Sequence, residues 1–181
     1  CGIRPTSVPV DAGPAPSRTT CTLSNGAVPS PTGGPAGERG EPLVVGPTVV
    51  YLVCNGQVDH VVRGNRISGS RVELAGRLLG ELGRKPSENE ARSGYETAVP
   101  AAVKVTGPRK GDPADTLRLE VALDDLPPLA LGQIVCTFSH ALAGSGPVRL
   151  AGSDDGPVRE FVCDTRLRTD PTAGAEAGSP L

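Results

Sequence analysis

Aromatic residues are scarce in this 181-residue chain, and methionine and tryptophan are absent. It contains two tyrosines and two phenylalanines. So few rings argue against a protein that stacks single-stranded nucleic acid or sugars on aromatic side chains. The formal net charge of −2 shows no excess of basic residues that could bind phosphate groups, so we expect no nucleic-acid partner. No apolar run reaches the roughly 18 residues that would span a membrane as a helix.

Histidine is also rare, and the familiar catalytic motifs are missing. The chain holds only His60 and His140. Ser139 precedes His140 on an expected helix, about 100° around the axis from it, which is poor geometry for a nucleophile and its base. No nucleophile elbow, phosphate loop or dinucleotide fingerprint occurs. We therefore expect no enzymatic activity and no cofactor; a hydrolase acting on the cell wall is the alternative.

Proline and glycine are abundant, and their distribution divides the chain into three parts. Residues 1–42 hold eight prolines and seven glycines without apolar periodicity, which predicts a flexible linker. Residues 166–181 have a similar character, so we expect a disordered tail. Residues 43–165 are left as the folded domain.

The start of the chain predicts a processed N-terminus, since the first residue is Cys1 and no methionine follows. Cys1-Gly2 before a Pro/Ser/Thr-rich stretch resembles the mature start of a bacterial lipoprotein. The resemblance implies a signal peptide removed before Cys1, diacylglycerol on its sulfur and fatty acids such as palmitate. Two or three acyl chains hold a protein stably at a membrane. Trimming at an arbitrary cysteine is the alternative.

Residues 43–165 show helix and strand signals in the order ββαββαββ. Asn55-Gly56 predicts a tight hairpin turn, and Ser70 with Glu73 forms a capping box that begins a helix. The expected strands are 43–54, 57–63, 101–106, 116–123, 147–151 and 158–163, and the expected helices are 70–82 and 129–143. This order predicts an α+β fold with two helices packed on one face of an antiparallel sheet.

Residues 45–164 resemble the GerMN domain, named from a spore-germination protein and common in lipoproteins of actinobacteria. The resemblance is carried by the segments 49–53, 78–79, 93–100, 131–137 and 147–150. Arginine outnumbers lysine 15 to 3, which also suits a high-G+C actinobacterium. The family implies an extracytoplasmic, non-enzymatic protein on the outer face of the membrane. Its domain would bind an envelope protein or a cell-wall polymer, in sporulation or envelope signalling. A structural subunit of an envelope complex is a further alternative.

Four cysteines remain once Cys1 is assigned to lipid. An even number in an exported protein favours two disulfides, and four cysteines allow three pairings. Cys54 and Cys163 both sit at strand ends, and Cys136 lies off the apolar stripe of its helix. We therefore expect the pairs Cys54–Cys163 and Cys21–Cys136.

A zinc site is the alternative use of these cysteines. Cys136 and His140 are spaced i, i+4 and share one helical face. With Cys54 and Cys163 they would complete a Cys₃His set. The thiols are not closely paired as in a zinc ribbon, and an oxidising compartment favours disulfides, so we expect no metal.

Several residues could form a contact surface. Tyr95 lies in a loop and is either a packed anchor or part of such a surface. Four arginines, Arg63, Arg66, Arg71 and Arg77, cluster in the sequence around the first helix. They form either a solvated face or a contact with anionic headgroups or wall polymers.

Overall fold

The structure is a computed structural model that describes residues 21–22, 43–44, 47–176 and 178–181. It has the expected α+β fold. The strands are β1 (Leu43–Val44), β2 (Thr48–Cys54), β3 (Gln57–Arg63), β4 (Ser68–Gly69), β5 (Tyr95–Glu96), β6 (Val105–Thr106), β7 (Leu117–Leu119), β8 (Val148–Ala151), β9 (Arg159–Phe161) and β10 (Ser179–Pro180). The helices are α1 (Arg71–Gly83), α2 (Glu88–Arg92), the 3₁₀ turn η1 (Leu123–Asp125), α3 (Pro128–Leu142), α4 (Thr165–Thr169) and α5 (Pro171–Glu176).

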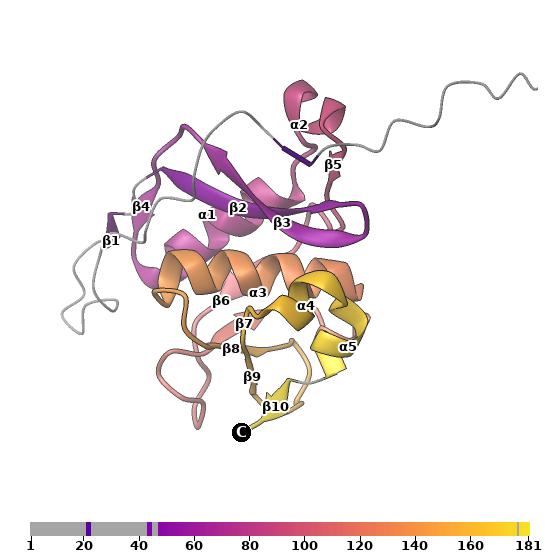
Figure 1. The fold of residues 1–181 in the computed structure, drawn as a ribbon. Helices are drawn as coiled ribbons and strands as arrows, with labels where there is room; N and C mark the ends of the chain where they lie inside the picture. The colour runs from indigo at the N-terminus through magenta and orange to yellow at the C-terminus, as the bar shows by residue number, and fades with distance from the viewer. Residues whose placement is uncertain (1–20, 23–42, 45–46, 177) are drawn as a thin grey trace, which may run out of the picture.

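The strands fall into separate sheets, which differs from the one antiparallel sheet that we expected. A three-stranded sheet has the order β3-β2-β5, a five-stranded sheet has the order β10-β9-β8-β7-β6, and β1 pairs with β4. α3 runs between the two larger sheets (Figure 1). β7 and β8 are parallel because α3 lies between them in sequence and carries the chain back to the same end of the sheet.

Local signals placed the first hairpin and the first helix correctly. β2 and β3 pair from Thr48↔Arg63 to Cys54↔Gln57. Asn55 and Gly56 both have positive φ, 53° and 75°, as a tight hairpin turn requires. The Ser70–Glu73 capping box is present at the start of α1. A second box joins Ser87 to Glu90 and begins α2, within the segment 86–93 that we expected to be a short helix or a loop.

α3 is buried nearly all round, because it separates the two sheets. Twelve of its fifteen residues are buried. Two of its buried polar residues complete the hydrogen bonds of β2, whose edge is covered by β5 only at Val53 and Cys54. Thr137 Oγ1 accepts from the Tyr51 N–H at 3.0 Å, and Gln133 Nε2 donates to the Tyr51 carbonyl at 3.0 Å. α3 therefore takes the place of a neighbouring strand.

The prediction of a disordered tail over 166–181 is wrong. α4, α5 and β10 occupy this segment, and Asp164 caps α4 by accepting from the Leu167 N–H. Leu167 is 1% exposed. Gly174 lets α5 approach it closely, since a Cβ there would lie 2.5 Å from the Leu167 Cα. The small residues that suggested disorder serve close packing instead.

Two of the expected strands are shorter than the sequence indicated. Only Val105–Thr106 of 101–106 and Leu117–Leu119 of 116–123 are strands. Arg118, between the buried Leu117 and Leu119, is buried as well, because it binds Asp112 in a bidentate ion pair. Cys1 and most of the expected linker lie outside the described residues. Within the described part of the chain, no helix has the length and apolar character needed to cross a membrane.

A candidate polar pocket and a disulfide-pinned N-terminal segment

The disulfide pairing predicted from the sequence is wrong. The structure joins Cys21 to Cys54, with 5.9 Å between their Cα atoms, and Cys136 to Cys163, with 4.9 Å. We had placed Cys54 and Cys163 on one sheet. Cys54 is instead the last residue of β2, and Cys163 comes shortly after β9. These strands belong to different sheets, so the two cysteines do not meet. The chain between β9 and α4 brings Cys163 to α3, and Cys21 lies against β2 and β5.

These bridges also remove the alternative zinc site. Cys54, Cys136 and Cys163 all lie in disulfides, which leaves His140 without thiolate partners. No group of three or more potential metal-ligating side chains is found among the residues that the structure describes. Two disulfides are typical of proteins in an oxidising, extracytoplasmic compartment.

Cys21 is held by backbone and side-chain contacts as well as by its disulfide. Its N–H donates to the Ser93 carbonyl at 3.2 Å, and its carbonyl accepts from the Tyr95 hydroxyl at 2.5 Å. The Asn55 amide lies 3.1 Å from its sulfur. Tyr95 is 4% exposed, and burial is the main cause that raises the pKa of its hydroxyl to about 12. Tyr95 is thus a packed anchor for Cys21 and not part of a surface.

The four arginines do not form one surface. Arg66 and Arg77 are exposed, whereas Arg71 donates to the carbonyls of Leu142 at 3.0 Å and Asp115 at 3.3 Å. Arg71 begins α1, and Arg63 reaches the other end of that helix. Two of the four therefore serve internal contacts.

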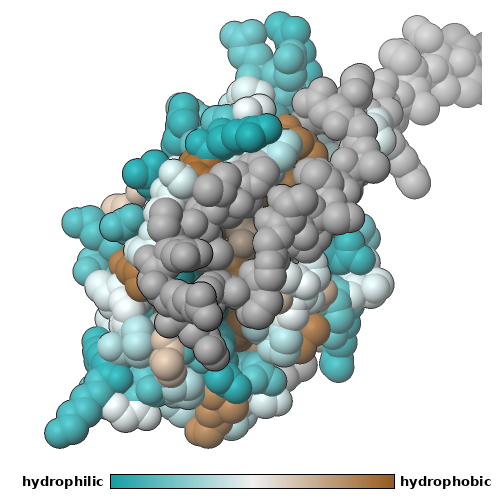
Figure 2. All heavy atoms as spheres, turned by 90° about the vertical axis from the view of Figure 1, so that its left-hand side faces the viewer, coloured by the Kyte–Doolittle hydropathy of each residue, from teal (hydrophilic) through white to brown (hydrophobic). Residues whose placement is uncertain are grey.

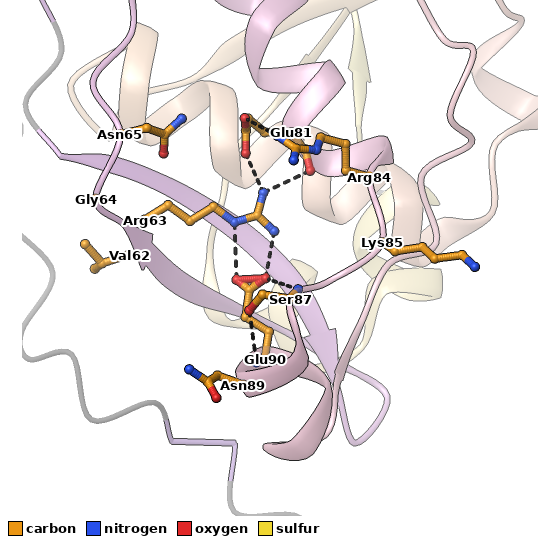
Figure 3. A pocket seen from close by; sticks show the side chains of 10 residues that line it. All are labelled: Val62, Arg63, Gly64, Asn65, Glu81, Arg84, Lys85, Ser87, Asn89 and Glu90. Atoms are coloured by element: carbon orange, nitrogen blue, oxygen red, sulfur yellow. Dashed lines mark hydrogen bonds and ion pairs between the residues drawn. The ribbon is translucent and has the colours of Figure 1, made fainter.

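Arg63 lies instead in a polar pocket that no sequence motif indicated. The cavity has a volume of about 450 Å³ and lies between the end of β3, the C-terminal end of α1 and α2. Its lining residues are shown in Figure 3 and are almost all polar or charged: Val62, Arg63, Gly64, Asn65, Glu81, Arg84, Lys85, Ser87, Asn89 and Glu90. Of these residues, Arg63 alone was a candidate from the sequence. The Ser87–Glu90 spacing is the signal of a helix cap and does not reveal a pocket.

A network of ion pairs holds the pocket together. Arg63 lies between Glu81 of α1 and Glu90 of α2 (Figure 3). Its Nη1 is 2.7 Å from Glu81 Oε2, and its Nε and Nη2 bind the two oxygens of Glu90 at 3.2 and 2.9 Å. The exposed fractions of the Arg63, Glu81 and Glu90 side chains are 15%, 14% and 5%. This shielding from water strengthens the pairs relative to ion pairs on the open surface.

The electrostatics favour the charged state of both partners. Burial alone would raise the pKa of Glu90, but hydrogen bonds from Arg63 and Ser87 outweigh it and hold the pKa below its ordinary value. Burial alone would lower the pKa of Arg63, and its bonds to Glu90 and Glu81 raise it instead. Arg63 and Glu90, at the base of the pocket, therefore both carry their charges near neutral pH.

Ser139 and His140, neighbours on α3, do not contact each other as a nucleophile and its base. The Ser139 hydroxyl donates to the Gly146 carbonyl at 2.7 Å, so it is committed to capping the turn after α3. His140 is 9% exposed, and burial, with a smaller effect of His60, lowers its pKa. His60 lies beside Asp59, with 3.1 Å between Nδ1 and Oδ1. No nucleophile is bound to a base among the contacts of the described residues.

Among solved structures the chain has a similarity in fold. No family model and no curated protein matches the chain. The chain is similar to the tandem GerMN domains of the sporulation protein GerM from Bacillus subtilis, with 19% sequence identity and a TM-score of 0.43. The match covers 62% of this chain and 40% of that structure, so the chain spans less than half its length. Membership of the GerMN family stays a prediction from the sequence.

Proposed function

We propose that this protein is a lipid-anchored, extracytoplasmic binding module of the bacterial envelope. Lipid on Cys1 would hold it at the outer face of the membrane, and the folded domain would bind a cell-wall component or an envelope protein. The proposal treats the protein as non-enzymatic. It is supported by the disulfide-bonded domain and by the absence of a bound nucleophile and base among the described residues.

The observation that carries the proposal is the attachment of Cys21 to the domain. The Cys21–Cys54 disulfide, the Ser93 carbonyl and the Tyr95 hydroxyl fix this residue beside β5. Only the 20 residues that follow Cys1 lead to this point. A chain of that length reaches at most about 70 Å when fully extended. Such an attachment would present the domain within a limited distance of a membrane surface.

The anchoring is tested by cell fractionation. The chain is expressed behind a lipoprotein signal peptide in a bacterial host, as wild type and as Cys1→Ser. Wild type should fractionate with membranes and Cys1→Ser should be released, because its hydroxyl does not take the place of the lipidated sulfur. Ser7→Ala is the matched control in the same segment and should stay with membranes. Equal release of wild type and Cys1→Ser would contradict the proposal.

A further inference from the structure

The charges around the pocket nearly cancel and leave one positive charge in excess. Arg63, Arg84 and Lys85 line the pocket together with two carboxylates, Glu81 and Glu90. Arg63 contacts both carboxylates, and Arg84 lies 3.3 Å from Glu81. Lys85 makes no ion pair with any residue that the structure describes. A ligand that carries one negative charge would therefore bring the pocket to neutrality.

The pocket also offers hydrogen-bonding groups that the described protein leaves unused. The side-chain amides of Asn65 and Asn89 have no hydrogen bond to other described residues, although both residues line the cavity. The Ser87 hydroxyl is engaged within the pocket, where it accepts from the Glu90 N–H at 3.3 Å. An amide side chain has a donor and an acceptor, which match the C=O and N–H of a peptide group. A cavity of about 450 Å³ also lies within the range of small-ligand sites.

Apolar anchors are scarce at the pocket and on the described surface. Val62 is the one aliphatic residue among those that line the cavity, and none of them is aromatic. Protein partners are usually anchored by aromatic side chains in dry pockets. Large hydrophobic side chains with high exposure in the described part are Val162 and Leu181, at 50% and 59%. On the face seen in Figure 2, hydrophilic residues are interspersed with small hydrophobic patches. These features favour a small polar ligand over a protein surface.

We propose that this pocket binds a short cell-wall peptide through its free carboxylate and its peptide groups. Lys85 at the rim pairs with the carboxylate, and the side-chain amides of Asn65 and Asn89 bind the peptide groups. The ion pairs of Arg63 hold β3, α1 and α2 at the spacing that the ligand needs. This inference rests on the proposed function and names its binding site and ligand class.

The test uses a peptide with a single negative charge. Diacetyl-L-Lys-D-Ala-D-Ala carries one carboxylate and no ammonium group, and it has the D-residues found in bacterial cell walls. The ¹⁵N-labelled full chain is titrated with this peptide and followed by amide chemical shifts. We expect the largest shifts at Asn65, Lys85, Ser87 and Asn89. Absence of shifts at these positions at millimolar peptide would overturn the inference.

Variants and altered peptides then test each part of the contact. Lys85→Gln should raise Kd about tenfold or more, since it removes a charge-assisted hydrogen bond. Lys110→Gln is the matched control, because Lys110 is an exposed lysine in the loop between β6 and β7. It should leave Kd unchanged. The same peptide with a C-terminal amide lacks the negative charge. Wild type should therefore bind the amide with a Kd at least as high as that of Lys85→Gln for the acid. Equal Kd for acid and amide would overturn the role of the carboxylate.

Two further outcomes separate this inference from the proposed function. If wild type and Lys85→Gln sediment equally with isolated cell walls, the domain binds the wall elsewhere, and only the pocket assignment is overturned. If the all-L peptide binds as tightly as the peptide with D-residues, the site recognises any peptide carboxylate, and the wall as ligand source is overturned. Thermal unfolding of Lys85→Gln at the wild-type temperature would show that its fold is intact.

Discussion

Replacing Glu90 with glutamine isolates the buried ion pair at the base of the pocket. Glutamine at this position keeps the shape of the side chain and can still accept from the Ser87 N–H, so the capping box of α2 survives. What is lost is the negative charge that Arg63 binds through two hydrogen bonds, at 3.2 and 2.9 Å. The substitution therefore tests the ion pair and not the helix cap.

The size of the effect follows from the burial of the pair. Breaking a buried ion pair costs about 3–5 kcal/mol when the remaining charge has no partner. Arg63 keeps Glu81 at 2.7 Å, and both arginine and glutamate side chains retain some contact with solvent. We therefore expect Glu90→Gln to lower the free energy of unfolding by about 2–3 kcal/mol at pH 7. For a domain of this size this corresponds to a fall of roughly 6–12 °C in Tm.

Urea unfolding followed by circular dichroism measures this loss in the free energy of unfolding. The pH dependence of the loss gives a second check. The pKa of Glu90 is lowered by folding, so its stabilising effect is fully present above the unfolded value of about 4.3. It is lost as pH falls through the folded value. The difference between wild type and Glu90→Gln should thus be constant near neutral pH and shrink toward zero in acid.

The matched control is Glu88→Gln on the same short helix. Glu88 is 90% exposed and lies 3.6 Å from Arg92, an arrangement worth less than about 0.5 kcal/mol. Equal stability losses for Glu88→Gln and Glu90→Gln, or a pH-independent loss for Glu90→Gln, would refute the reasoning.

Three other predictions test the remaining parts of the fold. Leu167→Ala should lower the free energy of unfolding by about 2–4 kcal/mol, because the side chain is 1% exposed beneath α5; a loss below about 0.5 kcal/mol in urea unfolding would mean that the C-terminal segment does not pack as described. Joint replacement of Cys136 and Cys163 by serine should cost up to about 3–4 kcal/mol, from a bridge that spans 27 positions, and unchanged Tm by calorimetry would contradict that. Asp112 has its pKa lowered to about 2, first by its hydrogen bonds from Arg118, so its stabilising effect should be present above about pH 4 and lost between there and about pH 2. Asp112→Asn should remove this part of the acid dependence, and an unchanged acid profile would count against the pair.

Elements that depend on neighbouring residues were predictable from the sequence. Asn55-Gly56 fixed the turn of the hairpin, and Ser70 with Glu73 fixed the start of α1, because both signals act within four residues. The bounds of α3 followed from its apolar content between Pro128 and Gly144. The sequence did not reveal that α3 lies between two sheets, although the buried Gln133 and Thr137 are the residues that make this position possible.

Features that depend on contacts distant in the sequence could not be derived in this way. The partner of Cys54 is 33 positions away, and the choice among three pairings rests on which elements meet in space. Arg63 was expected in a surface cluster, yet its partners are Glu81 and Glu90, 18 and 27 positions away. The C-terminal segment was taken for a tail because its small residues do not show the surface on which they pack.

The mass of the protein extracted from its native membrane, with free thiols alkylated before and after reduction, tests the central claim most directly. We predict a mass excess at Cys1 that matches a diacylglyceryl group, and four thiols that react only after reduction. A peptide map of the unreduced protein should then join Cys21 to Cys54 and Cys136 to Cys163. An unmodified Cys1, or four thiols that react without reduction, would contradict an anchored, disulfide-pinned binding module.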